Sequence, residues 1–316
     1  MNMTLYSFTI SIIQIVFILL LAPLLNGIMI KVKSRAERRV GPSIFQSFYD
    51  LRKLFKKETL RSNSSTFIFT AAPLIMIAST VVVIVISPIL STKELFNNSG
   101  DLFVIVFILL IGSMSVALLG LDAGTAFGGM GSSRAMTISS FSEPALLVSI
   151  AALSLQAKST NLPIIVSTNL HHTSWLLSPA HLLAIIALLI VIFAEAGRIP
   201  VDNPATHLEL TMIYEAMILE SSGENLALVK LSEYMRFTLL ICIVLNLFIP
   251  IGIDASNSWI LLVVSAGLMA LKLVLVSIII ALFETTQAKL RLFRVPELLA
   301  GAFVLATLAV VTEIVA

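Results

Sequence analysis

The sequence predicts an all-α integral membrane protein, a bundle of about eight transmembrane helices. Of its 316 residues, 58% are hydrophobic and only 12% are charged, whereas a soluble domain carries about 25% charged residues. The hydrophobic residues fall in long blocks, and a helix of about 20 residues crosses a hydrocarbon core. Helices satisfy their own backbone hydrogen bonds in lipid, which isolated strands do not. We therefore expect residues 1–316 to form a single membrane domain.

Eight blocks are long enough to be spans. They cover approximately residues 4–30, 66–90, 102–121, 136–156, 179–196, 235–253, 258–283 and 297–315. The first block runs on from the N-terminus without a small-residue cleavage site, which indicates a retained anchor rather than a signal peptide. An even number of spans places both termini on the same side of the membrane.

Basic residues predict which side that is. Nearly all Lys and Arg residues fall in the loops on one side, and the exceptions are Lys93, Lys158 and Lys272. By the positive-inside rule these loops are cytoplasmic, so both termini face outward and the chain is a multi-pass protein of the cell inner membrane. The net charge of +2 is too small to indicate nucleic-acid binding.

Charged residues inside the spans are the strongest functional signal. A charge at the bilayer centre costs at least about 2.5–3.5 kcal/mol, yet Glu143 lies in the fourth span and Lys272 in the seventh. Glu195 closes the fifth span, three residues before Arg198, close enough to pair across a helical turn. Desolvation brings such groups within reach of proton exchange near neutral pH. We interpret them as a proton relay; the alternative is ion pairing that only holds helices together.

The loop after the fifth span is rich in acids. Pro200 and Pro204 exclude a continuous helix between them, and from Thr206 the pattern predicts a helix that ends near Glu220, with Gly223 as terminator. The candidate proton-path residues here are Glu195, Asp202, His207, Glu209, Glu215 and Glu220. Apolar residues between them favour a packed, hydrated acidic funnel over an ordinary solvated loop.

The loop after the first span carries an amphipathic helix within residues 45–58. Phe48, Leu51 and Phe55 recur at helical spacing, and charged residues lie opposite. Such a helix lies at the membrane interface. It grips anionic lipid headgroups, forms a platform for a soluble partner, or does both.

Electron carriers and nucleotide sites are not expected on this chain. Its one cysteine, Cys242, cannot form an intrachain disulfide, a zinc site or an iron–sulfur cluster. The four histidines have no metal-site spacing, and no phosphate loop, dinucleotide fingerprint or nucleophile motif is present.

Several motifs in the charged loops are specific when taken together. They are Arg38 and Arg39 with Gly41 and Pro42; Asp50, Lys53, Leu54, Lys57 and Glu58; Gly131, Arg134, Glu143 and Pro144; Arg198, Pro200 and Asp202; and Glu220 with Gly223. With these motifs the chain resembles, over nearly its whole length, the H-type membrane subunit shared by respiratory complex I (NADH-quinone oxidoreductase) and the group 4 membrane-bound hydrogenases, which include the formate hydrogenlyase membrane subunit.

Three features favour the hydrogenase branch: the loop around Asp122, the stretch 281–292, and Lys272 upstream of it. One stretch departs from the family pattern of Glu-Ala-Glu-x-Glu. Here Ala205 and His207 replace two of the acids, so only Glu209 keeps its carboxylate.

The resemblance implies a non-catalytic membrane-anchor subunit of an energy-converting hydrogenase or hydrogenase-like complex. It would dock the soluble electron-transfer module and couple redox chemistry to proton or sodium translocation. The proton path would comprise Glu143, Glu195, Asp202, His207, Glu209, Glu215, Glu220 and Lys272, with Arg134 and Arg198 as charge partners. The soluble-arm interface would comprise Arg38, Arg39, Gly41, Pro42, Asp50, Lys53, Lys57, Glu58 and Asp122.

Partners implied by the resemblance are a hydrogenase-like or complex I-like large subunit, an iron–sulfur subunit, antiporter-like membrane subunits and membrane lipids. A nickel–iron centre and iron–sulfur clusters would lie on the partners, with no cofactor on this chain. Two alternatives stay open: the H-type subunit of complex I, which forms part of a quinone chamber, and a stand-alone ion transporter. The transporter predicts internal repeats or broken helices, which the sequence does not clearly show.

Overall fold

The computed structural model describes residues 2–61, 65–92, 100–171, 178–203, 212–254 and 258–315. Within these ranges the chain is nearly all helix, and the only β-pairing is two isolated bridges, Ser91 with Asp254 and Asp101 with Asn161. The helices are α1 (Asn2–Ala36), α2 (Gln46–Phe55), α3 (Ile68–Ile86), α4 (Leu102–Asp122), α5 (Ala126–Ala157), α6 (Leu162–His171), α7 (Pro179–Glu195), α8 (Tyr214–Ile218), α9 (Gly223–Phe248), α10 (Trp259–Thr286) and α11 (Val295–Val315), the last preceded by a 3-10 turn, Leu292–Arg294.

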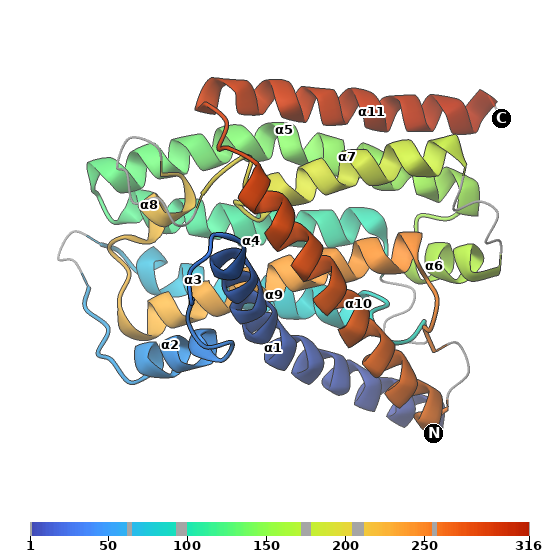
Figure 1. The fold of residues 1–316 in the computed structure, drawn as a ribbon, viewed down its shortest axis with the longest axis horizontal. Helices are drawn as coiled ribbons and strands as arrows, with labels where there is room; N and C mark the ends of the chain where they lie inside the picture. The colour runs from blue at the N-terminus through green and yellow to red at the C-terminus, as the bar shows by residue number, and fades with distance from the viewer. Residues whose placement is uncertain are drawn as a thin grey trace.

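The helices pack as a bundle with two distinct ends. α5, α7 and α11 lie side by side, and α10 crosses α1 on another face (Figure 1). The start of α1 and the end of α11 lie at one end of the bundle, and α2 and α8 lie at the other (Figure 1).

Six helical segments among the described residues are long and apolar enough to span a membrane. They are Tyr6–Ala36, Ile68–Ile86, Leu102–Asp122, Ala126–Ala157, Trp259–Thr286 and Leu292–Val315. Two of the eight predicted spans fall outside this set. α7 is apolar but has only 17 residues, and α9 carries Lys230, Glu233 and Arg236 among its first fourteen residues.

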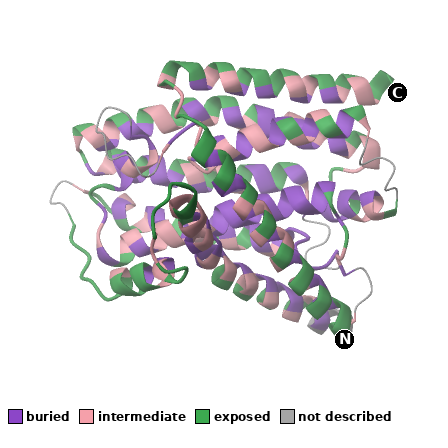
Figure 2. Ribbon diagram, in the orientation of Figure 1, coloured by how far each residue is buried: buried purple, intermediate pink, exposed green. Residues whose placement is uncertain are grey.

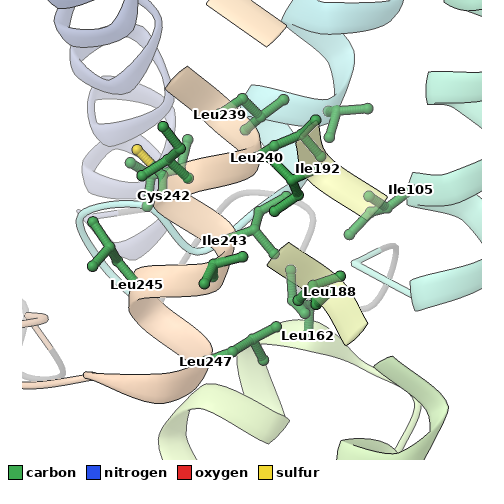
Figure 3. Close-up of a cluster of buried hydrophobic side chains, with 14 of the residues drawn as sticks. Ile105, Leu162, Leu188, Ile192, Leu239, Leu240, Cys242, Ile243, Leu245 and Leu247 are labelled. Carbon is green, nitrogen blue, oxygen red and sulfur yellow. The ribbon is translucent and has the colours of Figure 1, made fainter. Parts of the chain in front are cut away.

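The core lies along α9. Every residue from Met235 to Phe248 is buried, and Figure 2 shows this helix in the colour of buried residues while the outer sides of α10 and α11 are largely exposed. Figure 3 shows α9 side chains such as Leu240 and Ile243 packed against Ile105 of α4 and Leu188 of α7. Close van der Waals packing of this kind holds helices together in lipid.

Two helices begin well before the predicted spans. α5 begins at Ala126 rather than 136, because its glycine-rich first turns pack closely instead of being hydrophobic. A Cβ on Gly128 would lie 2.3 Å from the carbonyl oxygen of Gly120 on α4, and one on Gly131 would lie 2.8 Å from Cβ of Ala216 on α8. α9 begins at Gly223 rather than 235.

The acidic segment does not form the predicted helix from Thr206 to Glu220. Met212 and Ile213 are not helical, and the only helix there in the described part is the five-residue α8; residues 204–211 lie outside the described residues. Gly223, the predicted terminator, instead begins α9 with φ +54°. A Cβ there would lie 2.6 Å from the carbonyl oxygen of Glu58, so the chain passes too close for any other residue.

Candidate functional site

A cavity of about 270 Å³ lies among α4, α5, α7, α8 and α9, in the half of the bundle nearer α2 and α8. Its wall is mostly apolar and rich in methionine, from Met76, Met114, Met136 and Met217. Met114, Met136 and Ser140 are exposed, so the cavity reaches the surface between α4 and α5. The charged residues of the wall are Glu143, Glu195, Asp202, Glu233 and Arg236. The first three were predicted from the sequence, and the last two were not.

Glu195 is held on both carboxylate oxygens. The Arg236 guanidinium donates to Glu195 Oε2 at 2.6 Å, and the Ser142 hydroxyl donates to Oε1 at 2.5 Å. Arg236 also donates to the carbonyl of Leu109 at 2.9 Å. The Arg236 side chain is only 9% exposed and that of Glu195 only 6%. The two therefore form a buried, hydrogen-bonded ion pair between α9 and α7.

The predicted pairing of Glu195 with Arg198 is therefore wrong. α7 ends at Glu195, and Gly197 then adopts φ +56°, which turns the chain. Arg198 consequently leaves the wall in another direction and approaches Glu284 of α10.

Glu143 differs from its neighbour because no cation pairs with it among the described residues. It projects into the cavity from α5, which continues through Pro144 to Ala157. The residue is partly exposed to the cavity, but its Oε1 atom is buried and has no hydrogen-bond partner in the described part of the chain. A buried carboxyl oxygen without a protein partner needs another group, such as a water, to complete its hydrogen bonding.

A second ion cluster joins α8 to α9. Lys230 donates to Glu215 at 2.5 Å and to Glu233 at 3.2 Å, and its ammonium lies 5.7 Å from the centre of the Tyr214 ring. Burial, with the nearby Glu233 and Glu215 carboxylates, raises the pKa of Tyr214 well above its ordinary value, so the phenol is neutral. The Tyr214 backbone N–H donates to Asp202 at 3.2 Å.

The turn between α7 and α8 is fastened to the end of α10. Asp202 accepts a hydrogen bond from Lys289 at 2.6 Å, and the Leu290 N–H donates to the carbonyl of Pro200 at 2.9 Å. Arg134 on α5 donates to the carbonyl of Met212 at 3.0 Å. These contacts hold both ends of the acidic segment against the bundle.

Two other predicted proton-path residues, Glu220 and Lys272, do not line the cavity. Glu220 is exposed at the turn before α9. Lys272 donates from α10 to the carbonyls of Ile249 and Ile251, at 2.7 and 2.5 Å, just beyond the end of α9. His207 and Glu209 lie outside the described residues.

The predicted interface residues lie on a surface at the α2 end of the bundle. Arg38, Arg39, Asp50, Lys53, Lys57 and Glu58 are exposed, and Gly41 and Pro42 are partly so. Lys31 donates to the carbonyl of Val40 at 3.0 Å, which fixes the loop that precedes α2. Asp122 accepts two hydrogen bonds from Thr66, at 2.5 and 2.9 Å, and thus fixes the start of α3.

Metal and thiol chemistry have no visible site in the described residues. Among the described residues, no three or more His, Cys, Asp or Glu side chains lie close enough together to hold a metal ion, and Cys242 is a buried free thiol on α9.

Known proteins match this chain over nearly its whole length. The sequence profile of the family described as NADH dehydrogenase matches residues 8–315. Hydrogenase-4 component C of Escherichia coli (strain K12) is 32% identical over 94% of this chain and 92% of its own length. Formate hydrogenlyase subunit 4 of the same organism is 28% identical over 96% and 98%.

A solved structure shares the fold. A chain of the membrane-bound sulfane sulfur reductase, an archaeal respiratory membrane complex, superposes with a TM-score of 0.84 over 99% of this chain and 100% of its own, at 19% sequence identity.

Proposed function

Because the chain belongs to the NADH dehydrogenase family, we propose that it is the membrane-anchor subunit of an energy-converting hydrogenase or hydrogenase-like complex. It docks the soluble electron-transfer module and couples electron transfer to proton or sodium translocation. Both relatives described above bear the names of hydrogenase or formate hydrogenlyase components, which supports this branch over a complex I subunit with a quinone chamber.

Orientation follows from the charged loops. In the proposal α7 and α9 complete eight spans, and α2 lies at the membrane interface. The end that carries α2 and α8 is rich in Lys and Arg and faces the cytoplasm, and both termini face outward across the inner membrane.

The observation that carries the proposal is the contrast between two carboxylates in one cavity. Glu195 is neutralised by Arg236, whereas Glu143 has no cation within the described residues. In this arrangement Glu143 binds and releases the proton, and the Arg236–Glu195 pair supplies a fixed, charge-neutral wall. The Lys230 cluster and Asp202 then line the approach from the cytoplasmic side. From the sequence alone, His207 and Glu209 are proposed as further members of the proton path.

The proton does not continue straight across this chain. Beyond Glu143 and Arg236 the interior is filled by Leu109, Leu146, Leu240 and Ile243, and Figure 3 shows part of this apolar region. The cavity instead reaches the bundle surface between α4 and α5, at the exposed residues Met114, Met136 and Ser140. We therefore propose that an antiporter-like subunit covers this opening and receives the proton.

Docking of the soluble module involves the platform formed by residues 38–61. Its exposed charges suit an iron–sulfur subunit and a large subunit that carries a nickel–iron centre, because the electron carriers must reside on other chains. Lipid headgroups contact the basic residues at the membrane edge of the platform.

Replacing Glu143 by Gln tests the relay. In inverted membrane vesicles that contain the native complex, we expect electron transfer to an artificial acceptor to persist while proton uptake, followed with a pH-sensitive dye, is lost. Glu224, exposed in the first turn of α9, is the matched control, and Glu224→Gln is expected to pump normally. Normal proton uptake by Glu143→Gln would refute the relay.

Purification in mild detergent tests the assembly. A nickel-bearing large subunit that co-purifies with iron–sulfur proteins supports the hydrogenase-type complex. An NADH-oxidising module with bound quinone would replace it with the complex I alternative, and a lone chain would replace it with the stand-alone transporter.

A further inference from the structure

A further buried cluster of charges, distinct from the Lys230 cluster, is formed by Lys33, Glu284 and Arg198 and lies behind the cavity wall. Glu284 on α10 is only 3% exposed, and Lys33 of α1 forms a direct ion pair with its Oε2. The Arg198 guanidinium approaches Oε1 at 4.0 Å. Two cations thus share one carboxylate, and the cluster carries a net charge of +1. The sequence pattern singled out the stretch around Glu284 without assigning the residue a role.

Phe237 joins this cluster to the cavity. The Arg198 guanidinium lies over the Phe237 ring, 4.6 Å from its centre, and the ring forms part of the cavity wall. Arg198 also donates to Asn26 at 3.3 Å. The turn that begins at Arg198 continues to Asp202, which lines the same cavity. One aromatic ring therefore separates the cluster from the carboxylates inside.

Packing alone does not account for this cluster. Removing charges from water costs several kcal/mol per ion, and apolar side chains of similar volume usually pack there equally well or better. A charge in a low-dielectric interior, however, acts over a distance on neighbouring ionisable groups. The net positive charge behind Phe237 is therefore suited to control the charge state of the cavity.

We propose that Glu284 is a positioning residue that holds Arg198 against Phe237 and, together with Lys33, sets the electrostatic potential of the cavity. The proposal rests on the function proposed above. The charged groups that face Glu284 are Lys33 of α1 and Arg198 of the turn. Glu37, just beyond the end of α1, is exposed and acts on Lys33. Those around the cavity are Glu143, Glu195, Asp202, Glu215, Glu233, Lys230, Arg236 and Lys289.

Opposite charge changes make the proposal testable. Glu284→Gln raises the net charge of the cluster to +2, Lys33→Met lowers it to zero, and the double variant returns it to +1. The pH is varied for the full-length chain in lipid nanodiscs, and the intensity of the infrared band of protonated carboxyl groups gives the pH midpoint at which the cavity carboxyl loses its proton. A unit charge about 10 Å away, at an effective dielectric constant of about 20, moves such a midpoint by about one pH unit.

We expect Glu284→Gln to move the midpoint to lower pH, because added positive charge favours carboxylates. Lys33→Met moves it to higher pH, and the double variant restores it. Glu284→Asp, which keeps the charge, titrates like the wild type. Unchanged midpoints, shifts of equal sign, or a double variant that stays displaced would overturn the proposal. If Glu284→Gln fails to fold, Lys33→Met decides alone.

Glu143→Gln in the same titration separates this proposal from the relay. Loss of the band assigns it to Glu143 and supports the proposed function. If the band survives, that assignment is refuted. The proposal for Glu284 is still tested, because the cavity carboxyl that gives the surviving band responds to the same electrostatic potential of the Lys33, Glu284 and Arg198 cluster.

Discussion

Replacing Arg236 by Met removes the only cation that contacts Glu195 among the described residues. The methionine fills similar space, but the Glu195 carboxylate keeps only the Ser142 hydroxyl as a partner. Breaking a buried ion pair from one side costs about 3–5 kcal/mol, since the other charge is left without compensation.

Thermal unfolding of the purified chain measures the effect. Cys242 is the only cysteine and is buried on α9, so a thiol-reactive fluorescent dye reports its exposure. We expect Arg236→Met to lower Tm by roughly 10 °C at pH 7, by the scaling known for soluble domains.

A second substitution checks that the charge is responsible. Glu195→Gln in the Arg236→Met background removes the isolated carboxylate, and it is expected to recover at least half of the lost Tm. Arg52→Met, an exposed position on α2, serves as the control and should leave Tm unchanged. The reasoning fails if Arg236→Met is as stable as the wild type, or if the double variant is no better than the single one.

Three further predictions concern other parts of the chain. Gly223→Ala should destabilise the protein by about 1–3 kcal/mol, because φ is +54° and the added Cβ would clash with the carbonyl oxygen of Glu58. Gly267→Ala is the control and should not destabilise it, because no atom lies within 4 Å of the added Cβ. Equal Tm values for the two variants would contradict the prediction. Tyr214 should show no phenolate absorbance up to about pH 10, measured as the difference between the wild type and Tyr214→Phe, because its pKa is raised. The contribution of the neutral phenol to stability is lost only as the pH rises above about 10. A rise in absorbance at lower pH would show that the phenol is not buried. Lys272→Met should lower Tm, because it removes the two hydrogen bonds to the carbonyls beyond α9, yet leave proton uptake intact; loss of uptake would return Lys272 to the proton route.

Hydropathy predicts long apolar helices well and small-residue helices badly. The predicted spans over α3, α4 and α10 agree with the structure to within a few residues. Hydropathy does not reveal the first turns of α5, because Gly128 and Gly131 contribute close contacts with α4 and α8 rather than hydrophobicity. α6, with only ten residues, is too short to be recognised as a span, although Leu162, Ile165, Val166 and Asn169 are all buried at helical spacing.

The site was predictable as a set of residues but not as a set of pairs. The structure brings Glu143, Glu195 and Asp202 to one cavity, as a proton path requires, and their proton chemistry stays a prediction. The partner of Glu195 is 41 positions away in sequence, so spacing along one helix pointed to Arg198 instead. The pairing of Glu284 with Lys33 could not be predicted from the sequence, because the two residues lie near opposite ends of the chain and meet only where α10 crosses α1.

The segment between α2 and α3 is tied to the start of α9. Ser222, just before α9, both accepts a hydrogen bond from the Leu60 N–H at 2.8 Å and donates to the Leu60 carbonyl at 3.2 Å. The Ser222 side-chain hydroxyl thereby joins the platform to the residue just before the central helix α9. This part of the surface is therefore held in place by contacts within the chain itself.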